Sequence, residues 1–171
     1  QIIDLLTPEG VKRVSNMEDG DEVDINAAID AINQGKTKYT AVDGTAELKQ
    51  AVIDKLERDN GLSYQANQIL VSVGGKQSFF NLSQAMLDAG DEVIIPAPYW
   101  VSYPDMVLLA DAVPVIIEAG QDQHFKITPE QLEAAITPKT RLFVINSPSN
   151  PSGMAYSKAE LEALGEVLRK Y

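Results

Sequence analysis

From about residue 45 onward, segments with the period of an α-helix alternate with short segments rich in β-branched residues. Residues 45–61 place their apolar side chains on one helical face and stop at an Asn-Gly pair, whereas residues 68–75 form a β-branched run that ends in two glycines. The alternation continues with expected strands at 91–98, 113–119 and 141–148, and with expected helices at 76–90, 99–112, 127–136 and 157–171. This order predicts an α/β fold of three layers, a mostly parallel sheet with helices on both faces.

The first 36 residues lack this regular alternation. Residues 17–24 are acidic and indicate a loop, and residues 26–35 predict a short helix with an asparagine cap and a glycine stop. We therefore expect an irregular N-terminal segment over residues 1–36 and one α/β domain over residues 37–171.

Charge and composition exclude several classes of function. The formal net charge of -11 disfavours nucleic acid and anionic membranes as partners. The chain has no cysteine and a single histidine, His124, so neither disulfides nor a cysteine or histidine metal site is expected. It also lacks an apolar run of the ~20 residues that span a bilayer, and no signal peptide is visible, so the expected location is the cytoplasm.

Three loops of unusual composition follow expected strands, at residues 74–77, 96–100 and 146–153. In parallel sheets, ligands bind just beyond the carboxyl ends of the strands. Because all three loops are expected at such ends, they predict one shared ligand site.

Each loop offers a chemical group to a ligand and also has an interpretation without one. Gly75 and Lys76 open a helix whose free N–H groups suit a phosphate, although a tight turn without a ligand has the same pattern. Trp100 can stack on a flat ring or belong to the core. Asn150 precedes a proline that favours extended backbone, so its amide either faces a ligand or serves only the turn.

Four stretches together resemble one family. They are VSVGGKQSFFN, IIPAPYWVSYPDM, FVINSPSNPSGMAYS and KTKYTAVDGTAELKQAV. Together they are similar to the class I aminotransferases that use pyridoxal 5'-phosphate (PLP), and most similar to the bacterial aspartate subgroup, some members of which accept prephenate. The resemblance covers residues 36–171.

The resemblance implies roles for five residues. Trp100 would stack on the pyridine ring of PLP, and Asn150 would bind its phenolic oxygen; both would also contact the substrate. Gly75 and Lys76 would wrap the phosphate, and Tyr39 would reach the phosphate in the partner subunit of a homodimer. The implied reaction is amino-group transfer between L-aspartate and 2-oxoglutarate, an amino acid and a 2-oxo acid.

The sequence also departs from the family pattern. The Schiff-base lysine, the carboxylate that pairs with the pyridinium nitrogen and the substrate-binding arginine all lie beyond the family position that matches Tyr171. No catalytic residue is therefore assigned, and the expectation is a partial PLP-binding large domain that is inactive by itself. Near the N-terminus, the glycine loop that usually follows a segment like QIIDL is missing.

Two other interpretations stay open at this stage. The chain can be a non-catalytic α/β module, a degenerate or engineered fragment that binds a phosphorylated ligand weakly or not at all. A nucleotide-binding fold ranks lower, because the sequence contains neither G-x-G-x-x-G after a strand nor G-x-x-x-x-G-K-[ST].

Overall fold

A computed structural model describes residues 19–171 of the chain. They divide into two compact units, with the boundary between Val71 and Ser72, and each unit is described by itself. The sequence predicted that a glycine loop of the family is absent near the N-terminus, and this prediction falls outside the described residues. The predicted domain boundary at residue 36 stays a prediction.

The first unit contains the helices α3 (Asp19–Asn33) and α4 (Ala46–Asn60) and the short 3-10 helix η1 (Ala66–Gln68). Helix α3 begins at Asp19, so the loop predicted for residues 17–24 is wrong for residues 19–24. Helix α4 has the predicted limits: the Thr45 hydroxyl accepts a hydrogen bond from Leu48 N, and Gly61 ends the helix in the left-handed conformation.

The strand predicted over residues 68–75 does not form. Residues 69–72 have no regular secondary structure, and Leu70 is 61% exposed. Val71 N donates to Asp43 O over 3.0 Å, but no described strand pairs with this segment. Since β-branched residues become a strand only when a neighbour accepts their backbone bonds, the prediction from composition was wrong here.

The turn before α4, where Asp43 O accepts the hydrogen bond from Val71 N, requires a glycine. Gly44 has a φ of +105°, and a Cβ atom there would lie 2.6 Å from Val71 Cγ2. Beside it, the buried Lys49 pairs with Asp43, and the hydrogen bond from this ammonium holds the pKa of the Asp43 carboxyl below its ordinary value. The segment around Val71 is therefore held to the start of α4 by packing and by one backbone bond.

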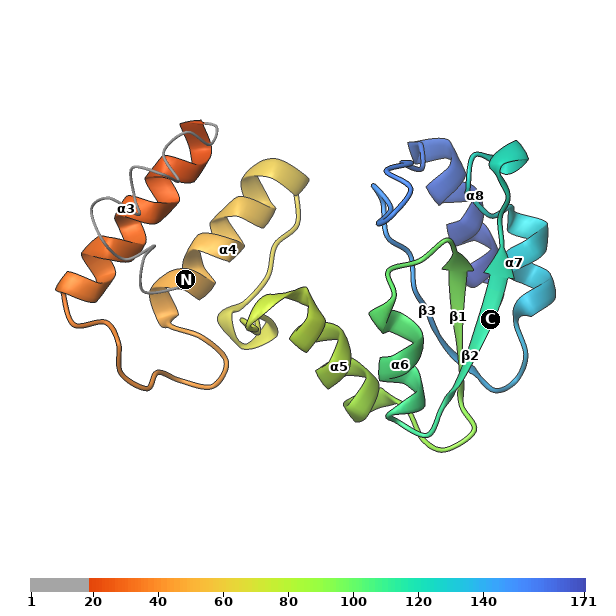
Figure 1. Ribbon diagram of the computed structural model, residues 1–171, viewed down its shortest axis with the longest axis horizontal. Coiled ribbons are helices and arrows are strands. Elements are labelled where there is room, and N and C mark those ends of the chain that lie inside the picture. The colour runs from red at the N-terminus through yellow and green to blue at the C-terminus, as the bar shows by residue number, and fades with distance from the viewer. Residues whose placement is uncertain (1–18) are drawn as a thin grey trace. The chain divides into compact units, whose positions relative to one another are not determined.

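The second unit contains a parallel sheet of three strands, β1 (Glu92–Ala97), β2 (Val113–Glu118) and β3 (Thr140–Phe143), in the order β2-β1-β3 (Figure 1). Glu92 is paired with Val113 on one side and with Thr140 on the other. The ladder to β3 shifts register between Glu92 and Val93. The predicted parallel sheet is confirmed.

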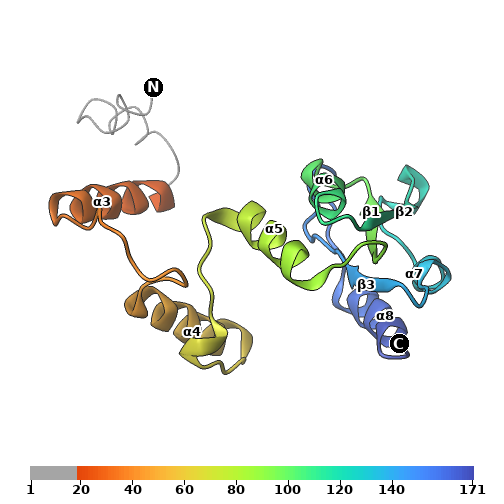
Figure 2. The same ribbon diagram turned by 90° about the horizontal axis from the view of Figure 1, so that it is seen from below.

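Helices cover both faces of this sheet. Figures 1 and 2 show α5 (Gly74–Met86) and α6 (Ser102–Leu108) on one side, and α7 (Pro129–Ala135) and α8 (Lys158–Leu168) on the other. The 3-10 helix η2 (Gln121–Gln123) precedes α7. The three-layer α/β prediction is therefore confirmed.

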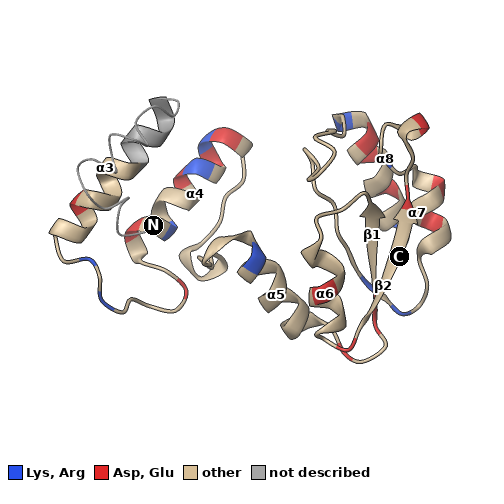
Figure 3. Cartoon of the chain, in the orientation of Figure 1, with Lys and Arg blue, Asp and Glu red and all other residues tan. Residues whose placement is uncertain are grey.

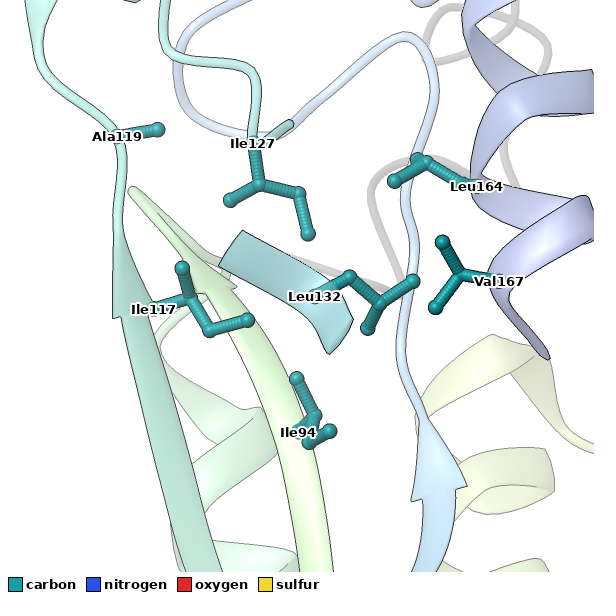
Figure 4. Close-up of a cluster of buried hydrophobic side chains, with 7 residues drawn as sticks. All are labelled: Ile94, Ile117, Ala119, Ile127, Leu132, Leu164 and Val167. Carbon is teal, nitrogen blue, oxygen red and sulfur yellow. The ribbon is translucent and has the colours of Figure 1, made fainter. Parts of the chain in front are cut away.

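Strand β1 supplies side chains to two separate cores. Val93 and Ile95 pack with Val107 of α6 on one face. The other face forms the cluster of Figure 4, which consists of Ile94, Ile117, Ala119, Ile127, Leu132, Leu164 and Val167. Because its apolar side chains are buried on both faces, β1 is the centre of the unit.

Capping residues determine where helices α7 and α8 begin. Thr128 and Ser157 each accept a hydrogen bond from the third residue of their helix, and the side chain of that residue bonds back to the cap. Both predicted caps are confirmed. Pro104 lies in the first turn of α6, one of the two positions expected for it.

Residues 19–171 contain no helix with the length and apolar composition that a membrane span requires. No group of three potential metal ligands gathers within this part of the chain.

The buried hydroxyl of Ser83 in α5 lowers the stability of the fold, and a substitution can remove it. Its side chain is 0% exposed, and its hydroxyl has no hydrogen-bond partner among the described residues. We expect Ser83→Ala to raise the free energy of unfolding by about 1 kcal/mol in urea titrations, because it removes an unsatisfied buried group. The exposed Ser78 lies on the same helix and its hydroxyl forms only a long hydrogen bond of 3.5 Å to Gly74 O, so Ser78→Ala is the control for the change in helix propensity. A loss of stability in Ser83→Ala would contradict the expectation.

Candidate functional site

A groove of about 700 Å³ opens in the second unit where α5 begins and where β1 and β3 end. Four of the five predicted site residues line it: Gly75, Lys76, Trp100 and Asn150. The fifth, Tyr39, belongs to the first unit, where it is fully exposed in the segment 37–42. The structure thus brings residues from three separate stretches to one groove, although the strand expected before Gly75 does not form.

Trp100 is held in the groove by an aromatic series. Its ring meets Tyr103 edge to face with centroids 5.3 Å apart, and Tyr103 meets Phe79 of α5 in the same way at 5.1 Å. Since Tyr103 lies in α6, the series joins both helices that cover this face of the sheet. Trp100 is therefore part of an aromatic cluster and also lines the groove, and its stacking on a ligand ring stays a prediction.

The first turn of α5 brings positive charge to the groove. The helix begins at Gly74, two residues earlier than predicted, so Gly75 and Lys76 lie in its first turn, where N–H groups have no acceptor within the helix. Nothing within 4 Å would meet a Cβ atom at Gly75. Lys76 is the only charged residue of α5, visible as its single blue segment in Figure 3.

The Lys76 ammonium interacts with the tryptophan. It lies 4.9 Å from the centroid of the Trp100 ring, a cation–π distance. Two of the predicted residues thus contact each other, and the positive charge lies directly beside the aromatic surface.

The loop after β3 is folded by its own hydrogen bonds. Asn150 N donates to Asn146 Oδ1 over 2.9 Å, and Gly153 N donates to Ser149 O over 2.7 Å. Gly153 has a φ of +70°, which favours glycine at the turn. The loop returns toward α8 at Tyr156, whose N–H donates to Ser147 Oγ over 2.9 Å.

A second anchor joins this loop to the segment before α7. The Tyr156 hydroxyl accepts a hydrogen bond from Ile127 N at 2.9 Å, and burial raises the pKa of this phenol. Beside it, Lys126 Nζ lies 2.6 Å from Glu160 Oε1, at the start of α8. The hydrogen bond from Lys126, with further bonds from Ser157, lowers the pKa of Glu160 to about 2.

Sequence reasoning missed several residues of the groove. Ser78, Phe79, Tyr103 and Asn146 also line it. Spacing is a signal for one of them, because Phe79 stands three positions after Lys76 on the same helix and so shares a face with it. Tyr103 also stands three positions after Trp100, but Trp100 precedes α6. Asn146 belongs to the motif at residues 146–153, but no pattern in the sequence predicted its hydrogen bond with Asn150.

The chemistry of the groove suits a flat, anionic ligand. An indole offers a surface for a ring, and helix N–H groups with one ammonium offer a site for a phosphate or carboxylate. The amide of Asn150 can donate to a ligand oxygen. These groups fit the parts of PLP to which the resemblance assigned them.

Comparison with known proteins gives consistent matches. The profile of the family described as aminotransferase class I and II matches residues 15–171. An aspartate/prephenate aminotransferase of Nitrosomonas europaea is 66% identical over 146 residues, which are 85% of this chain and 37% of that protein.

Solved structures agree with the sequence match. The aspartate aminotransferase from Rhizobium meliloti matches with a TM-score of 0.79 and 50% identity, over 96% of this chain and 38% of that one. The aspartate aminotransferase from Thermus thermophilus with maleate gives 0.80 and 46%, over 96% of this chain and 40% of that one. The chain therefore spans well under half the length of the proteins it matches.

The low pKa of Glu160 predicts a dependence of stability on pH. A carboxyl whose pKa falls from 4.5 to about 2 on folding stabilises the fold above pH 4.5, and this stabilisation is lost as pH falls toward 2. We expect Glu160→Gln to be less stable than wild type at pH 6, with the difference shrinking toward pH 2, in urea titrations across this range. The exposed Glu162 pairs with Lys158 on the same helix, so Glu162→Gln is the control and should change little. A difference that is constant with pH would contradict the role of the ion pair.

Proposed function

The chain belongs to the class I and II aminotransferase family, and from this premise we propose that its second unit carries the ring- and phosphate-binding part of a PLP site. The observation that carries the proposal is the shared groove of Gly75, Lys76, Trp100 and Asn150. These residues come from three loops that are distant in sequence. A fold without a ligand does not require these residues to line one groove.

Each residue has a distinct part in the proposal. Trp100 supports the cofactor ring, the first N–H groups of α5 with Lys76 bind the phosphate, and Asn150 binds the phenolic oxygen and contacts the substrate. When bound, PLP supplies an electron sink for the charge that develops at the substrate α-carbon. The protein residues named here bind and orient; none of them is assigned a proton transfer.

The proposed substrates are an amino acid and a 2-oxo acid, with L-aspartate and 2-oxoglutarate as the leading pair. The support is that the relatives are named aspartate or aspartate/prephenate aminotransferases. The Thermus thermophilus structure is described as being with maleate, a four-carbon dicarboxylate with the same number of carboxylates as aspartate.

The 171 residues by themselves are proposed to hold PLP without catalysing the transfer. None of their lysines corresponds to the Schiff-base lysine of the resemblance, and Lys76 is placed in the phosphate-binding turn instead. Residues 37–171 are accordingly proposed as part of the PLP-binding large domain. A cytoplasmic location stays a prediction from the sequence.

One observation favours a second candidate, the non-catalytic module. The glycines of the first α5 turn and the Lys76 ammonium form an anion site that does not depend on a cofactor ring. Such a module would bind inorganic phosphate about as well as PLP. The two candidates therefore differ in whether Trp100 contributes to binding.

Titration with PLP tests the proposal directly. Trp100 is the only tryptophan, so quenching of its fluorescence reports on the groove, and calorimetry gives the affinity of variants that lack it. We expect PLP to bind more tightly than inorganic phosphate, and Trp100→Ala to weaken PLP about tenfold, since a lost aromatic stack costs ~1.4 kcal/mol.

The control for this titration is Tyr64→Ala, which removes an exposed aromatic side chain outside the groove. Treatment of the complex with borohydride should leave no single lysine labelled in stoichiometric amount. Equal affinity for PLP in Trp100→Ala and wild type would overturn the site, and equal binding of phosphate and PLP would favour the non-catalytic module.

We also propose that the chain associates with a second copy through the segment around Tyr39. Tyr39 and Val42 are almost completely exposed, which is unusual for two apolar side chains in one short segment. Light scattering should give a mass above 18.6 kDa that rises with concentration, and Tyr39→Ser with Val42→Ser should lower it. Leu62→Ser, at another exposed apolar residue, is the control. A constant mass of 18.6 kDa at every concentration would contradict association.

A further inference from the structure

Asn146 lies just after the end of β3, at the start of the loop that carries Asn150. Val144 N still donates to Ile94 O over 2.9 Å, so the chain is attached to β1 just two residues before Asn146. Asn146 and Asn150 both line the groove, and both also line a smaller cavity beside it. The first asparagine is thus fixed to the sheet, whereas the second lies further out in the loop.

The two asparagines are joined by one hydrogen bond. Asn150 N donates to Asn146 Oδ1 over 2.9 Å. The next residue, Pro151, has no N–H group and so adds no backbone donor that would fix the loop at this point. Among the described residues, none forms a hydrogen bond with the Asn150 side chain itself. The bond to Asn146 is therefore the direct tie between the backbone of Asn150 and the end of β3.

We propose that Asn146 is a positioning residue, which acts through its Oδ1 atom to hold Asn150 in the orientation that presents its amide to the groove. The inference rests on the proposed function, since it gives Asn150 a ligand to meet. It adds a residue to which the resemblance assigned no role.

The alternative is that Asn146 contacts the ligand itself. Its Nδ2 group has no acceptor among the described residues, and the side chain lines the groove. The two roles use different atoms, because positioning needs the acceptor Oδ1 whereas direct contact needs the donor Nδ2. Asn146→Asp keeps the acceptor and removes the donor, and Asn146→Ala removes both.

The first experiment uses NMR to measure hydrogen exchange of the backbone N–H of Asn150 in the absence of any ligand. We expect Asn146→Ala to speed the exchange about fivefold, the effect of losing one ordinary hydrogen bond, and Asn146→Asp to leave it as slow as in wild type or slower. Ser152 Oγ accepts a hydrogen bond from Met154 N in the same loop, so Ser152→Ala is the matched control and should not change exchange at Asn150. Unchanged exchange in Asn146→Ala would overturn the proposal.

The second experiment is a double-mutant cycle on the affinity for PLP. If Asn146 acts through Asn150, Asn146→Ala weakens binding in the wild-type background and has no further effect in Asn150→Ala. Independent effects that multiply in the double variant would identify direct contact and overturn positioning.

The cycle also separates this inference from the proposed function. If Trp100→Ala and Asn150→Ala both leave the PLP affinity unchanged, the proposed function fails, and the exchange experiment still decides whether Asn146 holds Asn150. If Asn150→Ala weakens binding while Asn146→Ala does not, the function stands and the positioning role is wrong.

Discussion

The burial of β1 on both faces is the constraint on which the second unit depends. Val93, Ile94 and Ile95 are at most 1% exposed, and consecutive side chains enter different cores. A strand buried in this way cannot slip by one residue, because every side chain would exchange one core for the other. The register of β1 therefore fixes where the chain leaves the sheet, and with it the position of Trp100.

Parallel pairing extends this control to the other loops. Strand β3 runs beside β1 in the same direction, so the loop that carries Asn150 emerges at the same edge as the loop that carries Trp100. Helix α5 is joined to that edge by the aromatic contact between Phe79 and Tyr103. A net charge of -11 does not oppose an anionic ligand here, because α5 contributes one ammonium and no carboxylate to the groove.

Sequence periodicity predicted the elements whose signals are local. The caps Thr128 and Ser157 and the stop at Gly61 each depend on residues within one turn, and the structure has all three. The strand predicted at 68–75 depended on a partner that a β-branched run does not specify, and it is absent. In the same way, motifs identified Gly75, Lys76, Trp100 and Asn150 in the groove, but the contact of Lys76 with Trp100 depends on packing between separate segments, and that of Asn146 with Asn150 depends on the folding of one loop.

The groove combines fixed and adjustable groups. Trp100 is held by a series of rings, and the backbone of Asn150 is held by Asn146, so these two are set before a ligand arrives. Lys76 is instead an exposed side chain with several rotatable bonds, and its ammonium rests on the indole. An aromatic ring that needs a defined plane would meet the fixed Trp100, whereas an anionic group would meet the fixed N–H groups of α5 together with a lysine that can follow it. The proposed ligand, PLP, has a ring and a phosphate with these different geometric demands. The order of Asn150, rather than that of Lys76, is therefore the property that the loop after β3 maintains.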